Sequence, residues 1–224
     1  RAGLAGADGP THHGLLDLAF MRCVPNMIVA APRNEQELRN IMYTASLDSF
    51  KSHEKAITIR YPRGEGVMPA WRTTLEEIEI GKGVQLMEGD EIAILSIGHI
   101  GNEAIAACEK ARELGLKPAL FDMRFVKPLD EELLHRVFKQ FKTIITVEDA
   151  AIQGGFSSAI AEFMVDHCYT AKIIRLGIAD EIVEHGEQKE LYALCGIDAN
   201  GILAKIQANT IPVPAKNNPK ALVS

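Results

Sequence analysis

The chain has 224 residues, a formal net charge of −6 and 47% hydrophobic residues, which is typical of a protein with a buried core. The acidic balance argues against a nucleic-acid partner, which requires a basic face. No apolar run approaches the roughly 20 residues that a membrane span needs. The four cysteines lack C-x-x-C spacing and predict reduced thiols, as expected of a cytoplasmic protein.

Residues 1–64 predict a first α/β block. Apolar runs that end at prolines are typical of buried strands, and apolar side chains at helical spacing predict the intervening helices. The expected elements are a helix over 15–23, a strand over 26–32, a helix over 34–47 and a strand over 56–62. Asn34 is the expected N-cap of the second helix. Residues 65–80 lose all periodicity and predict a linker between two domains.

Residues 81–208 alternate between apolar strands and amphipathic helices. The expected strands are 82–91, as a hairpin strand leading into the next, then 91–97, 118–123, 143–148 and 172–177, with helices between them and a last helix over 191–208. This alternation is typical of a mainly parallel sheet covered by helices. Residues 209–224 are rich in proline, asparagine and lysine and predict a flexible tail.

The segment GADGPTHHG, residues 6–14, places an acid and two histidines on irregular, glycine-flanked backbone. Asp8 precedes Gly-Pro, so its carboxylate lies in a turn, where it either faces a cleft or caps the following helix. His12 and His13 are adjacent and cannot share a helical face, so at most one points into a site. Zinc at His13 and Asp17 would need further ligands. The pattern alone leaves a structural role and a site role equally open.

Residues 60–64, RYPRG, place two arginines at the carboxyl end of a predicted strand, where open α/β sheets bind ligands. A guanidinium suits phosphate or carboxylate oxygens, although the residues alone slightly favour ordinary salt bridges. Residues 147–160 open a helix with two glycines and two serines, which is a possible anion site. That segment matches no phosphate-binding motif, and close backbone packing is the simpler reason for its glycines.

Five segments, in order, resemble the last third of the 1-deoxy-D-xylulose-5-phosphate synthases, a family of transketolase-type enzymes that depend on thiamine diphosphate. They are RAGLAGADGPTHHGLLDLAFMRCVPNMIVAAP, IRYPRG, DMRFVKPLDEELL, VEDAAIQGGFSSAI and GIADEIVEHG. The resemblance runs from Arg1 to about Ala208. It implies an α/β fold in which part of a pyrimidine-binding (transketolase middle) domain, residues 1–64, precedes a transketolase C-terminal domain, residues 81–208, with a mainly parallel sheet.

The resemblance also implies a reaction. Members of the family condense pyruvate with glyceraldehyde 3-phosphate, with decarboxylation, to form 1-deoxyxylulose 5-phosphate for isoprenoid, thiamine and pyridoxal precursor synthesis. A cytoplasmic homodimer is expected.

Particular residues receive roles from the same resemblance. Arg1 and Arg63 match positions that bind the phosphate of the acceptor, and Arg60 is a weaker candidate for that role. Asp8 matches a carboxylate near the substrate hydroxyls. His12 matches a histidine that hydrogen-bonds substrate oxygens and assists proton transfer, a role for which imidazole is well suited.

Thiamine diphosphate and Mg²⁺ are expected in the full-length enzyme and not in these residues alone. In the family, a Gly-Asp-Gly segment and a following asparagine hold the magnesium, whereas this chain has only EGDE at 88–91, in an expected hairpin turn. The glutamate that activates the aminopyrimidine is expected upstream of Arg1. We therefore assign no metal ligand and expect a fragment that the N-terminal part of the same polypeptide completes.

Two other interpretations are consistent with parts of the pattern. A β-type subunit of a 2-oxoacid dehydrogenase has a similar order of blocks, but RAGLAGADGPTHHG together with RYPRG favours the synthase. A non-catalytic dimerisation module would keep the fold without the chemistry. The combination of Asp8, His12 and Arg63 argues against it, because a purely structural module does not need that set.

Because the diphosphate site is expected elsewhere, we predict that this chain alone neither binds thiamine diphosphate tightly nor turns over. Calorimetric titration of the isolated chain with the cofactor and Mg²⁺ is the test. Micromolar binding would contradict the prediction.

Overall fold

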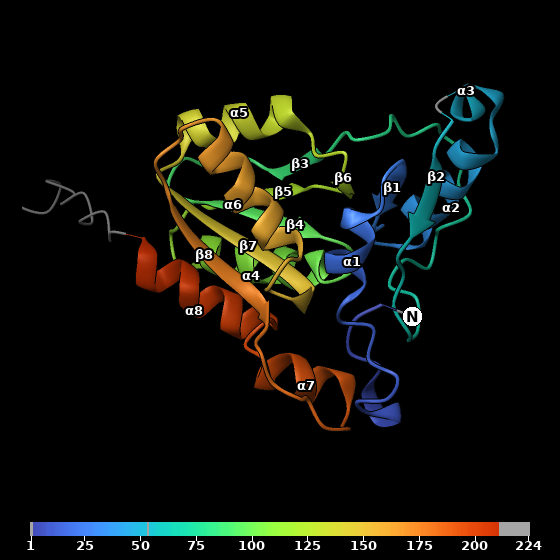
Figure 1. Cartoon of the computed structure of the whole chain (residues 1–224). Helices are drawn as coiled ribbons and strands as arrows, with labels where there is room; N and C mark the ends of the chain where they lie inside the picture. The colour runs from blue at the N-terminus through green and yellow to red at the C-terminus, as the bar shows by residue number, and fades with distance from the viewer. Residues whose placement is uncertain (1, 53, 211–224) are drawn as a thin grey trace, which may run out of the picture.

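Two β-sheets organise the chain, and helices cover them (Figure 1). The computed structural model describes residues 2–52 and 54–210. The helices are the 3₁₀-helix η1 (Gly6–Asp8), α1 (Asp17–Cys23), α2 (Glu35–Ser46), α3 (Asp48–Lys51), α4 (Gly101–Glu113), α5 (Glu131–Gln140), α6 (Phe156–Asp166), α7 (Gln188–Leu194) and α8 (Ala199–Asn209). The strands are β1 (Met27–Ala30), β2 (Ala56–Ile59), β3 (Val84–Met87), β4 (Ala93–Ile97), β5 (Ala119–Asp122), β6 (Phe125–Lys127), β7 (Thr143–Ala151) and β8 (Lys172–Ile178).

The larger sheet has the strand order β3-β5-β4-β7-β8. Its last four strands are parallel, and β3 pairs antiparallel with β5 at one edge. Every residue of β4 and β5 is buried, because α5 and α6 pack on one face of the sheet while α4 and α8 pack on the other. The predicted mainly parallel sheet with continuous apolar strands is therefore confirmed.

The smaller sheet has the order β2-β1-β6 and joins the two blocks of the sequence. Strands β1 and β2 are parallel, as consecutive strands with a helical crossover, whereas β6 comes from the second block and pairs antiparallel with β1. Phe125 of β6 packs in a small core with Ile28 and Ile41. The sequence analysis did not predict β6, which is only three residues long.

The structure corrects two of the expected elements and confirms one helix cap. The single helix expected over 191–208 is two helices, α7 and α8, because Gly196 between them takes a left-handed conformation with φ of +66°. Strand β3 does not form a hairpin with β4, because β5 and β7 already occupy both edges of β4. Asn34 caps α2 as predicted, its side chain accepting the Glu37 N–H at 3.0 Å.

Two further properties concern the described part of the chain. None of its helices combines the length and the apolar character needed to cross a bilayer. All four cysteines are free thiols, as the sequence predicts.

A buried polar cluster lies where α2 meets the carboxyl end of β5. Arg124 and Glu37 form an ion pair at 3.0 Å, and the Arg33 Nε lies 3.5 Å from a carboxylate oxygen of the fully buried Asp122. That oxygen makes no hydrogen bond to any described residue. Burial, followed by the nearby Glu37 carboxylate, raises the pKa of Asp122 to about 8.

This raised pKa predicts a pH-dependent stability. The folded state holds the Asp122 proton up to about pH 8, whereas an unfolded aspartate releases it near pH ~4, so the free energy of unfolding falls as pH rises between these values. We expect Asp122→Asn to flatten that slope, measured by urea unfolding at pH ~5 and pH ~8. The exposed Asp90→Asn is the control and should keep the slope. An unchanged slope in Asp122→Asn would contradict the assignment.

Candidate active site

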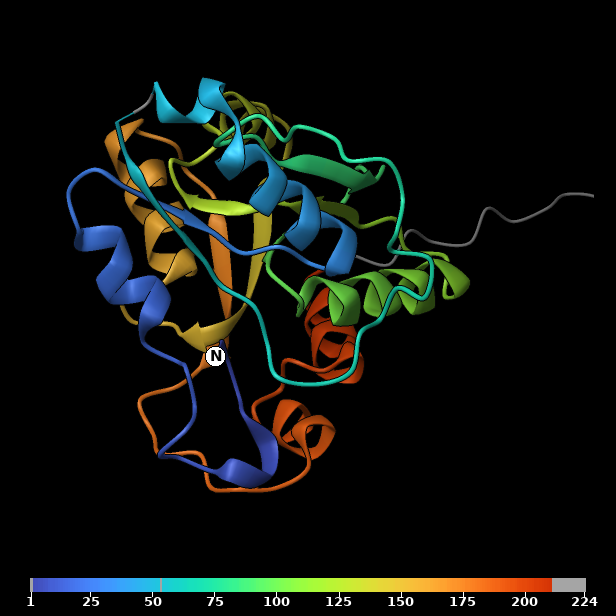
Figure 2. The same ribbon diagram turned by 90° about the vertical axis from the view of Figure 1, so that its right-hand side faces the viewer.

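The opening loop, residues 2–14, closes on itself and on the end of β2. The Ala2 N–H donates to the Tyr61 carbonyl at 2.9 Å, and Gly3 and Gly14 exchange two backbone hydrogen bonds at 2.8 and 2.9 Å. Figure 2 shows this loop, in dark blue, beside α7 of the second block. The segment with the predicted catalytic residues therefore lies between two parts of the chain that are distant in sequence.

Asp149, near the end of β7, anchors the start of this loop. Its side chain is fully buried and accepts the Leu4 N–H at 3.1 and 3.3 Å. His99 lies 3.0 Å away through its Nε2, and the Tyr192 hydroxyl donates to the carboxylate at 3.4 Å. Burial alone would raise the pKa of Asp149. The hydrogen bond from His99, the charges of His99 and Arg60 and the Leu4 N–H outweigh burial, so the pKa lies below its ordinary value.

Arg60 is a second buried charged residue, and it lies close to Asp149. The residue is only 6% exposed, and its guanidinium forms an ion pair with Asp17 at 2.8 Å. It also donates to the Gly14 carbonyl at 3.2 Å and to the Asp149 carbonyl. The structure therefore directs this predicted substrate-binding arginine inward, where it holds the Gly14 end of the opening loop against β7.

Arg63 lies three residues further on and has the opposite environment. Its side chain is 44% exposed and pairs with the carboxylate of Asp8. It also donates to the Ala5 carbonyl at 3.4 Å. The structure thus brings two of the predicted site residues together, across a sequence separation that spans α1, β1, α2, α3 and β2.

The two histidines of the loop have different surroundings. His12 is exposed, and its Nδ1 lies 2.9 Å from the Thr11 hydroxyl. The Nδ1 of His13 accepts the Ala5 N–H at 2.9 Å, which leaves the proton on Nε2 to donate to the Val183 carbonyl at 3.1 Å. The sequence analysis gave His13 no role, and the structure shows that it fixes the loop to the second block. Arg1 lies outside the described residues.

The sequence analysis missed four residues that hold this region, namely His99, Asp149, Gln188 and Tyr192. For two of them, the position in the sequence could have indicated a site. His99 follows β4 and Asp149 lies near the carboxyl end of β7, and polar residues at that edge of a parallel sheet gather around ligand sites. Gln188 and Tyr192 lie on α7, and their sequence pattern is that of an ordinary surface helix.

The possible anion site in residues 147–160 is filled by the chain itself. The carboxylate of Glu148 accepts the N–H groups of Phe156 and Ser157 at 2.7 and 2.8 Å, at the start of α6. A buried side-chain carboxylate thus takes the place that a phosphate would occupy at a helix N-terminus.

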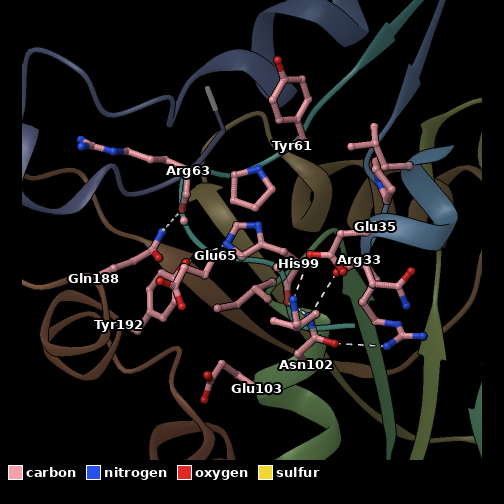
Figure 3. Close-up of a pocket in the computed structure, with 18 of the residues that line it drawn as sticks. Arg33, Glu35, Tyr61, Arg63, Glu65, His99, Asn102, Glu103, Gln188 and Tyr192 are labelled. Atoms are coloured by element: carbon pink, nitrogen blue, oxygen red, sulfur yellow. Dashed lines mark hydrogen bonds between the residues drawn. The ribbon is translucent and has the colours of Figure 1, made fainter. Parts of the chain in front are cut away.

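A cavity of about 360 Å³ is lined in part by residues 61–67 (Figure 3). Its walls include Arg33, His99, Glu103 and Tyr192, whereas Asp8 and His12 do not line it. The side chain of Arg63 points away from the other labelled side chains in Figure 3. Arg63 is itself among the residues that line the cavity, whereas its partner Asp8 is not.

Gly3 gives a test of the Asp149 anchor. A Cβ on Gly3 would lie 1.8 Å from a carboxylate oxygen of Asp149, in a residue with φ of +70°. We expect Gly3→Ala to lower the free energy of unfolding by about 3 kcal/mol, because a left-handed alanine also displaces a buried carboxylate. Gly115→Ala is the matched control, since Gly115 has φ of +82° and open space around it, and should cost about 1 kcal/mol. Equal losses, measured by urea unfolding, would contradict the anchor.

Comparison with known proteins agrees with this architecture. The family model for the transketolase pyrimidine-binding domain matches residues 1–67, and that for the transketolase C-terminal domain matches residues 81–202. The 1-deoxy-D-xylulose-5-phosphate synthase of Cytophaga hutchinsonii is 62% identical over 207 residues, which cover 92% of this chain and 32% of that protein. The synthase of Aquifex aeolicus is 43% identical over 203 residues, covering 90% and 31%.

Solved structures show the same fold. A split-gene transketolase, described as an inactive β4 tetramer, superimposes with a TM-score of 0.75 at 26% identity, covering 89% of this chain and 62% of that one. A transketolase mutant of Pichia stipitis gives a TM-score of 0.67 at 18% identity, covering 93% and 29%, and supports the fold alone.

The chain spans about a third of the length of these synthases, and the matches favour them over a 2-oxoacid dehydrogenase subunit. The chain is thus similar to one part of these synthases, and, because both transketolase domain models match it in order, it belongs to the transketolase family.

Proposed function

We propose that this chain forms the acceptor-binding part of a 1-deoxy-D-xylulose-5-phosphate synthase, a thiamine-diphosphate-dependent transferase. The reaction joins pyruvate and glyceraldehyde 3-phosphate with loss of carbon dioxide. The observation that carries the proposal is the partly exposed Arg63–Asp8 pair, in which Asp8 lies on a loop that buried groups fix in place, in a chain 62% identical to a protein of that name.

Arg63 is the residue we assign to the acceptor phosphate. A guanidinium binds phosphate oxygens through two parallel N–H donors, and such charge-assisted hydrogen bonds are strong. Its pairing with Asp8 orients the guanidinium before substrate arrives, so less entropy is lost on binding. Arg1 is proposed as a second phosphate ligand. Arg60, which is bonded to Asp17 and to two carbonyls, positions the loop instead.

Asp8 and His12 are assigned to the hydroxyl and carbonyl oxygens of the substrates. Asp8 lies beside the proposed phosphate ligand, so its carboxylate is placed to accept a hydrogen bond from an acceptor hydroxyl. When the Thr11 hydroxyl donates to Nδ1 of His12, the Nε2 carries the ring proton. That exposed N–H then hydrogen-bonds a substrate oxygen and supplies a proton as the oxygen gains charge.

The cofactor is assigned to the full-length enzyme rather than to these residues. Thiamine diphosphate supplies the carbanion chemistry of such an enzyme. Within residues 2–52 and 54–210, no group of three or more histidine, cysteine or acidic side chains could hold a metal ion. A cytoplasmic homodimer, completed by an N-terminal part of the polypeptide, is also part of the proposal.

The test uses Arg63→Ala in the full-length enzyme. We expect the KM for glyceraldehyde 3-phosphate to rise about 10- to 100-fold, because a charged hydrogen-bond partner of the phosphate is lost, while the KM for pyruvate changes little. Arg136→Ala, an exposed arginine on α5, is the control and should leave both constants unchanged. Absence of 1-deoxyxylulose 5-phosphate formation by the unaltered enzyme would overturn the proposed function.

A further inference from the structure

We propose that Gln188 of α7 is a positioning residue that sets how strongly the site binds the phosphate of its acceptor. The inference rests on the proposed function and deepens it, because it assigns part of the acceptor specificity to the second domain. Gln188 touches neither substrate. It acts through the backbone of Arg63.

The carboxamide of Gln188 joins two segments that are distant in sequence. Its Nε2 donates to the Leu4 carbonyl at 2.8 Å and to the Arg63 carbonyl at 3.3 Å. A side-chain amide has two N–H groups on one nitrogen, so both carbonyls are satisfied by a single group. Figure 3 shows the bond from Gln188 to the backbone of Arg63.

These bonds close a ring of contacts around the proposed phosphate site. Gln188 holds the backbone at Leu4 and Arg63, while the side chain of Arg63 reaches back to the Ala5 carbonyl and to Asp8. The backbone of Arg63 and its guanidinium are therefore fixed to the same short loop from two sides. Removing one member frees the backbone from which the guanidinium projects.

The helix that carries Gln188 is itself anchored to the buried cluster. Gln188 is the first residue of α7, and Tyr192, one turn later, is 6% exposed and hydrogen-bonds Asp149. Just before the helix, the Gly186 N–H donates to the Gly6 carbonyl at 3.4 Å. The position of Gln188 relative to Leu4 is therefore fixed by groups that do not involve Arg63.

This arrangement predicts that replacing Gln188 changes one kinetic constant, the KM for glyceraldehyde 3-phosphate. Losing a neutral hydrogen bond that only places Arg63 weakens phosphate binding modestly and leaves the reaction of pyruvate unaffected. A general loss of folding would instead lower kcat and the stability together. The distinguishing quantity is the preference for glyceraldehyde 3-phosphate over unphosphorylated glyceraldehyde, because only the phosphorylated acceptor uses Arg63.

The experiment compares Gln188→Ala and Gln188→Glu in the full-length enzyme. We expect Gln188→Ala to raise the KM for glyceraldehyde 3-phosphate about 3- to 10-fold and to lower the preference for that acceptor over glyceraldehyde by a similar factor. The KM for pyruvate and the melting temperature should stay the same. Gln188→Glu keeps the shape but replaces the donors by acceptors facing two carbonyls, so its effect should be at least as large.

Gln207→Ala, an exposed glutamine on α8, is the matched control and should change none of these quantities. If Arg63→Ala shows its expected effect while both Gln188 variants keep the wild-type preference, the inference is wrong and the proposed function stands. If Arg63→Ala leaves the acceptor KM unchanged, the phosphate assignment itself fails, whatever Gln188 does. A parallel fall in kcat for both acceptors and in melting temperature would also overturn the inference, because it would mark a structural role.

Discussion

The site depends on one buried negative charge. Asp149 is fully buried, and a carboxylate in that position is tolerated only because donors surround it. The Leu4 N–H comes from the opening loop, His99 follows β4, and Tyr192 comes from α7. Removing one donor would leave the buried charge less well compensated, so the carboxylate favours the meeting of three separate segments at one point.

The second domain also holds the opening loop in place. Asp149, Val183, Gly186 and Gln188 each contact the opening loop, and all four belong to the transketolase C-terminal part. The loop has little regular structure of its own, with one short 3₁₀-helix between its glycines. Its conformation is consequently imposed from outside, which explains how irregular backbone can hold Asp8 beside Arg63.

The sequence predicts those parts of the fold that local pattern determines. The strands of the larger sheet are continuous apolar runs, and Asn34 is followed by the N–H groups that it caps, so both were predictable. Strand β6 was not, because three residues carry too little pattern and its partner β1 lies about a hundred residues earlier. The break between α7 and α8 depends on the left-handed conformation of a single glycine, Gly196.

Local sequence pattern predicts even less of the candidate site. RYPRG presents two arginines of equal chemistry, and nothing local distinguishes them. The structure buries Arg60 because Asp17 and two carbonyls meet it, and leaves Arg63 exposed beside Asp8. These partners are set by tertiary packing. A resemblance to a known family separated the two arginines in advance, and residue chemistry alone did not.

The large sequence separation between Gln188 and Leu4 affects when the opening loop can fold during synthesis. Leu4 and Gln188 are 184 residues apart, so a nascent chain cannot close this bond until most of the sequence has left the ribosome. Contacts between such distant residues form late, because the entropy of closing a large loop must be overcome first. The opening loop therefore gains its contact with α7 only after the residues of the second domain have been made, and a chain that ends before Gln188 lacks this contact.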